Sequence, residues 1–321
     1  MFLNKEEIYY TSSDGETKVY ASFWVPDNPK MLLQIAHGMV EHIKRYEDFA
    51  KFLNNYGIVV FGNDHLGHGN TAVNEEKFGY FSDEDGDKNI VDDMHLLTKI
   101  AKEKYDNLPF AFLGHSMGSF LLRDYLCKYG EELDTAIIMG TGNEKPLTVK
   151  GGIAFIERVA NRKGWDYRSK VIDTLAFGGF NRNFGEKNGK NWLTRDEKEV
   201  DKYINDPKCS FVFTLNAYYN FLKIIHRLNQ DKNLENMPKD LHILLVSGDK
   251  DPVGDFGSKV LNVYEKFKAL DMKNVECKLY EGYRHEILNE IGKEVVYNDI
   301  LQWLEQIYEI KTCNLQKVTI K

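Results

Sequence analysis

The chain has 321 residues, of which 42% are hydrophobic and 28% charged, and its formal charge is −7. This balance is typical of a globular protein, excludes a disordered chain and argues against general nucleic-acid binding. Its four cysteines form no C-x-x-C pair, which argues against a zinc ribbon or a redox dithiol. We see no signal peptide and no apolar stretch long enough to span a bilayer, so we expect a cytoplasmic protein.

The first part of the chain alternates short apolar segments with amphipathic ones. Strands are predicted at residues 7–12, 18–25, 31–36, 58–61, 109–113 and 135–139. Helices are predicted at residues 43–56, 89–105 and 117–129. Because parallel strands need crossovers that are covered by helices, this order predicts an α/β fold with a mostly parallel, doubly wound sheet.

Residues 143–235 interrupt that order, because they contain no convincing strand. Helices are predicted there at residues 147–161, 170–176, 195–204 and 211–228. The earlier pattern then resumes, with strands at residues 241–246 and 275–280 and helices at residues 257–270 and 294–309. We therefore expect one α/β core, built from residues 1–142 and 236–310 and split by a helical cap at 143–235. Residues 311–321 form a tail without an assigned role.

The predicted cap differs from the rest of the chain in charge. It holds 17 Lys and Arg against 12 Asp and Glu, a net charge of +5, which leaves −12 for the remainder. Because interfacial helices with basic flanks are attracted to acidic lipid headgroups, one hypothesis is transient contact of the cap with an anionic membrane surface, as a peripheral protein. A solvated charged surface would give the same pattern.

Residues 114–118 read Gly-His-Ser-Met-Gly, which matches the pattern G-x-S-x-G. A predicted strand leads into this pentapeptide and a predicted helix follows it, which is the setting of a nucleophile elbow. The two glycines are required there because side chains would collide in so sharp a turn. Ser116 is therefore the candidate nucleophile. The alternative is an ordinary strand-to-helix turn with an N-capping serine.

A serine hydroxyl needs a base to accept its proton. His285 is the candidate, because it lies in the loop after the last predicted strand, and such loops bind ligands in sheets of this kind. A carboxylate must orient the imidazole, and Asp251 follows the strand at 241–246 in the chain order Ser, Asp, His. Asp249 stays open as the alternative, because spacing does not separate two acids that are two residues apart.

Two backbone N–H groups should stabilise the negative oxygen of a tetrahedral intermediate. One is that of Met117, directly after the nucleophile. The other is predicted at Met39, in the loop after the third strand, where Gly38 lets the backbone turn toward the serine. We expect no cofactor, because no nucleotide-binding glycine motif occurs. We expect no metal, because His65 and His68 lack a convincing third ligand.

These motifs resemble the α/β-hydrolase superfamily and, within it, the monoacylglycerol lipase and lysophospholipase-like group with its serine aminopeptidase S33-type domain. The resemblance covers nearly the whole chain. It implies an α/β-hydrolase fold with a cap and a triad that cleaves carboxylic esters through an acyl-enzyme, without a cofactor. It is carried by residues 37–38, 41–42, 45–46, 64–69, 114–118, 192–196, 206–207, 248–251 and 282–285.

The resemblance implies a small-molecule or single-chain lipid ester as the substrate, such as a monoacylglycerol or a lysophospholipid. Residues expected to bind it are Gly38, His115, Phe211, Phe213 and Tyr218, although the cap aromatics could equally form the cap's own core. A small-ester esterase, a thioesterase and an aminopeptidase would share the same catalytic residues, so these alternatives stay open. A non-catalytic ligand-binding protein of this fold is a further alternative, because fold does not dictate function.

Overall fold

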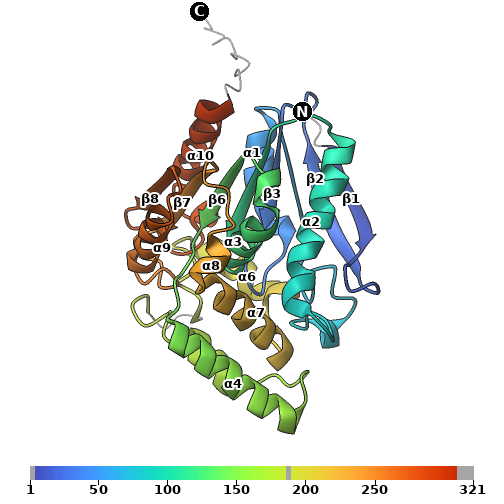
Figure 1. Cartoon of the computed structure of the whole chain (residues 1–321), viewed down its shortest axis with the longest axis vertical. Helices are drawn as coiled ribbons and strands as arrows, with labels where there is room; N and C mark the ends of the chain where they lie inside the picture. The colour runs from blue at the N-terminus through green and yellow to red at the C-terminus, as the bar shows by residue number, and fades with distance from the viewer. Residues whose placement is uncertain (1–3, 186–188, 309–321) are drawn as a thin grey trace, which may run out of the picture.

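The computed structural model describes residues 4–185 and 189–308, so the tail expected at 311–321 lies outside the described residues. A single eight-stranded sheet runs through the molecule, with helices on both of its faces (Figure 1). The strands are β1 (Asn4–Thr11), β2 (Lys18–Val25), β3 (Met31–Ala36), β4 (Ile58–Asn63), β5 (Phe110–His115), β6 (Thr135–Met139), β7 (His242–Gly248) and β8 (Asn274–Tyr280).

The strands follow one another across the sheet in the order β1-β2-β4-β3-β5-β6-β7-β8. Strand β2 is antiparallel to both β1 and β4, and all other neighbouring strands are parallel. The predicted α/β class with a mostly parallel sheet is therefore confirmed. Because parallel strands end at the same edge, the loops after β3, β5, β7 and β8 meet there.

Helices cover the sheet and build the predicted cap region. The α-helices are α1 (Glu47–Asn54), α2 (Gly86–Lys104), α3 (Met117–Tyr129), α4 (Pro146–Lys163), α5 (Lys170–Phe177), α6 (Glu197–Asn205), α7 (Leu215–Leu228), α8 (Asp231–Leu234), α9 (Ser258–Ala269) and α10 (Lys293–Tyr308). Short 3₁₀ helices are η1 (Ile43–Tyr46), η2 (Glu75–Lys77), η3 (Gly130–Glu132), η5 (Pro207–Cys209) and η6 (Ile287–Asn289).

Each face of the sheet has its own apolar core, because successive strand residues point to opposite sides. Leu32 of β3 packs in the same cluster as Leu122 of α3, whereas the next residue, Leu33, packs in the cluster that contains Leu304 of α10. All four side chains are fully buried. Burial of a leucine side chain stabilises a fold by about 1.5–3 kcal/mol, so these clusters hold the strand ends rigidly under the loops that follow them.

The predictions at 43–56 and 211–228 differ most from the helices in the structure. The helix predicted at 43–56 is divided into η1 and α1, because the carboxylate of Asp64 binds the N–H of Ile43 and the chain then begins with a tight 3₁₀ turn. The helix predicted at 211–228 begins only at Leu215. Thr214 caps it by accepting the N–H of Ala217, and residues 211–214 form no helix.

The described residues of 143–235 form helices and turns and no strand. Helix α7 packs against α2 and α3 on one side and against α4 on the other. Helix α4 consequently lies at the far end of the molecule (Figure 1). Within the described ranges, no helix is both long and apolar enough to cross a membrane.

Candidate active site

Ser116 lies in a sharp turn between β5 and α3. Its backbone has φ 52° and ψ −122°, a conformation that residues with side chains rarely adopt and that is found at functional sites. A Cβ on Gly114 would collide with the carbonyl oxygen of Gly118, and a Cβ on Gly118 would collide with that of Ala36. Neither glycine can therefore carry a side chain unless the backbone moves. The turn has the strand-to-helix geometry of a nucleophile elbow.

The structure brings His285 against Asp251, the two residues predicted to act with this serine. The Nδ1 atom of His285 lies 2.9 Å from Oδ2 of Asp251, and both side chains are buried. Asp249 faces elsewhere, because its Oδ1 accepts the N–H of Gly282 at 2.7 Å and its Oδ2 pairs with the exposed Lys250. The geometry thus separates the two candidate acids.

The environment of Asp251 favours its charged form. Burial by itself raises the pKa of this carboxyl, but His285 and hydrogen bonds from the N–H of Val253 (2.9 Å) and the hydroxyl of Ser247 (3.0 Å) lower it below its ordinary value. An ionised carboxylate at this position holds the Nδ1–H tautomer of His285, which leaves Nε2 as the basic nitrogen.

The ring of His285 is held on two sides. It packs between the rings of Trp192 and His115, with centroids 5.0 Å and 4.8 Å away, and the backbone N–H of His285 donates to the carbonyl of Trp192. A Cβ on Gly140 would lie only 3.2 Å from the Cε1 atom of the ring. The Nε2 atom is buried and has no hydrogen-bond partner among the residues that the structure describes.

The loop after β3 passes directly beside the serine. A Cβ on Gly38 would lie 3.0 Å from Cβ of Ser116. The carbonyl of Gly38 accepts a hydrogen bond from Nδ1 of His37 at 2.8 Å. Because a trans peptide places its C=O and N–H on opposite sides, the N–H of Met39 points away from His37. The N–H of Met117 lies in the first turn of α3, where helix N–H groups lack intrahelical partners.

Three buried histidines support this loop. The ring of His37 lies 4.1 Å from that of His65 and 5.1 Å from that of His68, and its Nε2 accepts the N–H of His65. Burial lowers the pKa of both His65 and His68 to about 3, so these rings are neutral at physiological pH. These neutral rings lie under the loop that carries Gly38 and Met39.

One group of described side chains lies close enough to hold a metal ion. Ligand atoms of His42, Asp206 and Cys209 lie within 4.8 Å of one another. His42 and Asp206 already satisfy each other, with Nε2 and Oδ2 2.8 Å apart. Burial holds the pKa of the Cys209 thiol well above its usual range, which disfavours the thiolate that a metal would need. The cluster therefore fits a hydrogen-bonded contact between the cap region and the loop after β3.

The predicted substrate-binding residues occupy different environments. Phe211 is half-buried and lines a cleft of about 460 Å³ together with Phe78. Phe213 is 1% exposed and packs in the core, and the hydroxyl of buried Tyr218 donates to Asp173. Gly38 adjoins Ser116 and His115 underlies His285, as described above. A role for these residues in substrate binding stays a prediction.

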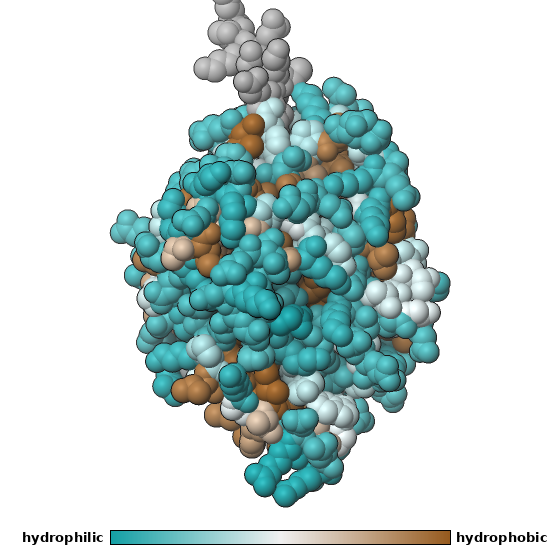
Figure 2. Space-filling view, viewed as in Figure 1, coloured by the Kyte–Doolittle hydropathy of each residue, from teal (hydrophilic) through white to brown (hydrophobic). Residues whose placement is uncertain are grey.

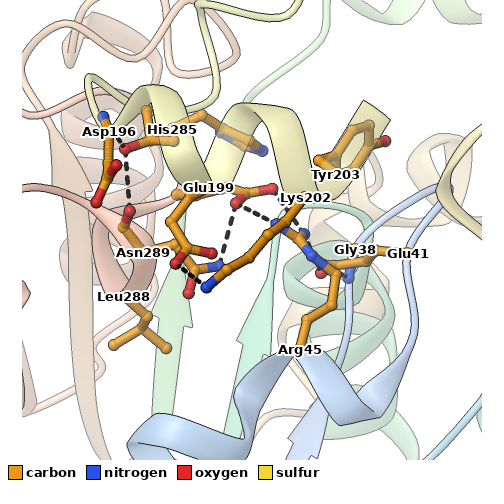
Figure 3. A network of polar contacts seen from close by, with 12 residues as sticks. Gly38, Glu41, Arg45, Asp196, Glu199, Lys202, Tyr203, His285, Leu288 and Asn289 are labelled. Atoms are coloured by element: carbon orange, nitrogen blue, oxygen red, sulfur yellow. Dashed lines mark hydrogen bonds and ion pairs between the residues drawn. The ribbon is translucent and has the colours of Figure 1, made fainter. Parts of the chain in front are cut away.

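A buried ion network lies beside the site, and its residues have no predicted catalytic role in the sequence. Arg45 forms ion pairs with Glu41, in the loop that carries Gly38, and with Glu286, which directly follows His285. Figure 3 shows Arg45 and Glu41 beside Gly38. Residues 41–42 and 45–46 contribute to the family resemblance, but no pattern in the sequence predicts that they lie close to residue 286.

Comparison with known proteins places the chain in a family. The family model described as serine aminopeptidase, S33, matches residues 27–292. Monoacylglycerol lipase of Mycolicibacterium smegmatis is 26% identical over 294 residues, 90% of this chain and 94% of that protein. Human monoglyceride lipase is 26% identical over 318 residues, with 93% and 90% covered. A solved carboxyl esterase of Bacillus coagulans, in complex with glycerol, is 28% identical with a TM-score of 0.88 over 96% of this chain and 100% of its own. The chain belongs to the serine aminopeptidase S33 family and has the α/β-hydrolase fold.

Proposed function

We propose that the chain is a serine carboxylic-ester hydrolase of the monoacylglycerol lipase type, with Ser116, Asp251 and His285 as its catalytic triad. The observation that carries this proposal is the buried 2.9 Å contact between His285 and Asp251, with the ring of His285 packed on His115, the residue before a serine held in an elbow. The lipase and esterase relatives support the choice of an ester as substrate.

In this reaction Oγ of Ser116 attacks the ester carbonyl carbon while its proton passes to Nε2 of His285, and Asp251 stabilises the imidazolium. The N–H groups of Met39 and Met117 bind the oxyanion, and each such donor contributes about 10²–10³-fold to kcat. The alcohol then leaves with the proton from His285. A water molecule, deprotonated by the same nitrogen, hydrolyses the acyl-serine to the free carboxylic acid and restores the enzyme.

We propose a single-chain ester of glycerol or a lysophospholipid as the substrate. Aromatic side chains supplied by the cap region, such as Phe211 beside Phe78, offer an apolar surface to an acyl chain. The solved esterase relative was crystallised with glycerol, which is the alcohol that a monoacylglycerol releases. These two features favour a lipid ester over a small one.

The test is hydrolysis of p-nitrophenyl esters from acetate to palmitate, a monoacylglycerol and a lysophosphatidylcholine by the wild type and Ser116→Ala. We expect medium or long chains to be preferred, the monoacylglycerol to be cleaved, and the variant to be inactive. Activity confined to acetate and butyrate would indicate a small-ester esterase. If no ester is cleaved although Ser116 reacts with a fluorophosphonate, the thioesterase and aminopeptidase alternatives would replace the ester proposal. A serine that is also unreactive with the fluorophosphonate would indicate a binding protein.

We further propose that the cap region docks transiently on anionic membranes. Large apolar side chains are exposed on α4 and α5, with Leu147 84% and Leu175 75% accessible, and apolar groups mark this end of the surface (Figure 2). Basic side chains are exposed on the same helices, which suits acidic headgroups. These are Lys150, Arg158, Arg162, Lys163 and Lys170.

Sedimentation with vesicles of phosphatidylglycerol or phosphatidylcholine tests the docking. We expect the wild type to bind the anionic vesicles more strongly, and Leu147→Glu and Leu175→Glu to weaken that binding. Val295→Glu is the matched control, because Val295 is 53% exposed on α10, outside the cap region. Equal binding to both vesicles, or equal losses in all three variants, would contradict the proposal.

A further inference from the structure

A buried ionic bridge joins two loops that flank Ser116. Nη1 of Arg45 donates to Oε2 of Glu41 at 2.8 Å, and its Nη1 and Nη2 donate to the two carboxylate oxygens of Glu286 at 2.8 Å and 2.6 Å. The Arg45 side chain is 11% exposed and each glutamate side chain only 4%. The guanidinium therefore binds both carboxylate oxygens of Glu286, which fixes the relative orientation of the two groups as well as the distance between them.

The Glu41 end of the bridge holds the loop predicted to form the oxyanion hole. Its Oε1 accepts the N–H of Gly38 at 2.5 Å and the hydroxyl of Tyr46 at 2.9 Å. The same oxygen lies 3.2 Å from Nδ1 of His115, the residue before the nucleophile. The orientation of the Gly38 peptide, and with it the direction of the next N–H, consequently depends on where Arg45 holds this carboxylate.

The Glu286 end holds the loop that carries the base. Glu286 follows His285 directly, and its N–H donates to the carbonyl of Leu193 at 2.7 Å. Its Oε2 also accepts the side-chain amide of Asn289 at 3.1 Å. The carbonyl on the other side of the peptide between His285 and Glu286, that of His285, lies 3.3 Å from Nε2 of His115. Because Glu286 is bonded directly to this peptide, a shift of the Arg45 guanidinium would move the imidazole.

Because the ion pairs of Arg45 are buried, displacement of any of their charged groups is unfavourable. Burial by itself raises the pKa of both glutamates. His115 and Arg45 outweigh this effect at Glu41, and Arg45 outweighs it at Glu286, so both carboxyl pKa values lie below their ordinary range. Both carboxylates therefore stay ionised, which is favourable only while their partners keep good geometry. The bridge has one well-defined arrangement rather than a range of them.

The cap region covers the same bridge. Tyr203 of α6 lies with its ring 4.9 Å from Cζ of Arg45. Its hydroxyl donates to the carbonyl of Val40 at 3.0 Å, next to Met39. The ring excludes water from the guanidinium, so the ion pairs are screened less than they would be at the surface.

We propose that Arg45 is a positioning residue for hydrolysis, which acts through Glu41 and Glu286 to hold the oxyanion loop and the base at a fixed separation on either side of Ser116. This inference rests on the proposed function, because it assigns Arg45 to the same reaction. It predicts that loss of the bridge slows the chemical step more than it weakens substrate binding.

The test compares Arg45→Met with Arg227→Met, a matched variant whose arginine bonds Asp87 and Asp124, outside both loops of the bridge. Arg227 of α7 also grips a carboxylate at two points, with Nε and Nη2 3.0 Å and 2.7 Å from the oxygens of Asp124. We expect Arg45→Met to lower kcat on p-nitrophenyl butyrate about 100-fold with KM within about threefold, since misplacement by 1 Å costs about this much. Arg227→Met should lower Tm but leave kcat within about threefold.

A double-mutant cycle separates positioning from general damage. If Arg45 acts through Glu286, the loss of kcat in Arg45→Met with Glu286→Gln should match the larger single loss rather than their product. Circular dichroism confirms that each variant is folded. If Arg45→Met does not fold, Arg45→Lys is used instead. Lysine keeps the positive charge but lacks the planar pair of donors that binds both oxygens of a carboxylate, so this variant should still lower kcat about tenfold. A folded Arg45 variant with the wild-type kcat would overturn the proposal.

A second readout keeps this proposal distinct from the choice of substrate. The rate of Ser116 labelling by a fluorophosphonate uses the base and the oxyanion donors but no lipid. We expect labelling of Arg45→Met to be at least tenfold slower than that of the wild type and of Arg227→Met. A wild type that is labelled but cleaves no lipid ester would refute the substrate proposal alone. Equal labelling rates would refute the role of Arg45.

Discussion

Replacement of Asp251 by asparagine should remove nearly all ester hydrolysis, whereas the same change at Asp249 should not. In the structure Oδ2 of Asp251 accepts Nδ1–H of His285 at 2.9 Å, and Oδ1 accepts the N–H of Val253 at 2.9 Å. An asparagine that keeps the second bond presents its NH₂ group to the imidazole. The ring then has to place its proton on Nε2, where it no longer accepts the proton of Ser116.

The size of the effect follows from what the carboxylate does. Loss of the correct tautomer in a serine, histidine and aspartate triad lowers kcat about 10⁴-fold. At about 1.4 kcal/mol for each factor of ten, this corresponds to about 5 kcal/mol of lost transition-state stabilisation. Asp249→Asn keeps a side-chain oxygen that can accept the N–H of Gly282, now 2.7 Å away, so its kcat should stay within about threefold of the wild type.

The assay is steady-state hydrolysis of p-nitrophenyl butyrate by the two variants and the wild type, with thermal denaturation to show that each is folded. Both changes convert an acid to its amide two residues apart, so each variant controls for the other. The reasoning would be refuted if Asp249→Asn lost more than 100-fold in kcat while folded Asp251→Asn kept a tenth or more of the wild-type value.

Two further predictions concern close packing and buried charge. Gly38→Ala would place a methyl group 2.7 Å from Oε1 of Glu41 and 3.0 Å from Cβ of Ser116, so kcat should fall at least 100-fold and the melting temperature should fall as the buried carboxylate shifts; a variant with wild-type kcat would contradict this. Burial raises the pKa of Asp93 from 3.8 to about 6, so its contribution to stability, present below pH 4, is lost as the pH rises through 6. The unfolding free energy of Asp93→Asn, measured with urea, should therefore rise relative to the wild type by about 2 kcal/mol from pH 4 to pH 7, and a constant difference would argue against it.

Local patterns in the sequence were sufficient to predict the sheet, the elbow and the members of the candidate site. The strands at 18–25, 31–36 and 135–139 have the predicted bounds, because each is a short apolar run between turn-forming residues. The glycines on either side of Ser116 report a steric requirement that lies within one turn of chain. His285 was found because it lies in a loop at the end of a predicted strand.

The tertiary structure alone separated Asp251 from Asp249, because both acids fit the spacing and only a contact with His285 distinguishes them. It also revealed that Phe213 is buried in the core, although its neighbour Phe211 lines a cleft. Such outcomes depend on how loops from distant parts of the chain meet.

The bridge through Arg45 shows the same limit most clearly, because Arg45 and Glu286 are 241 residues apart. Apolar periodicity and glycine spacing involve neighbouring residues, so the sequence by itself determined the α/β core and the position of the candidate nucleophile. Pairing of buried charges requires partners placed by the whole fold, because an ion is stable in the interior only where an opposite charge meets it. The tertiary structure therefore decided which carboxylate faces His285 and which residues hold together the two loops beside Ser116.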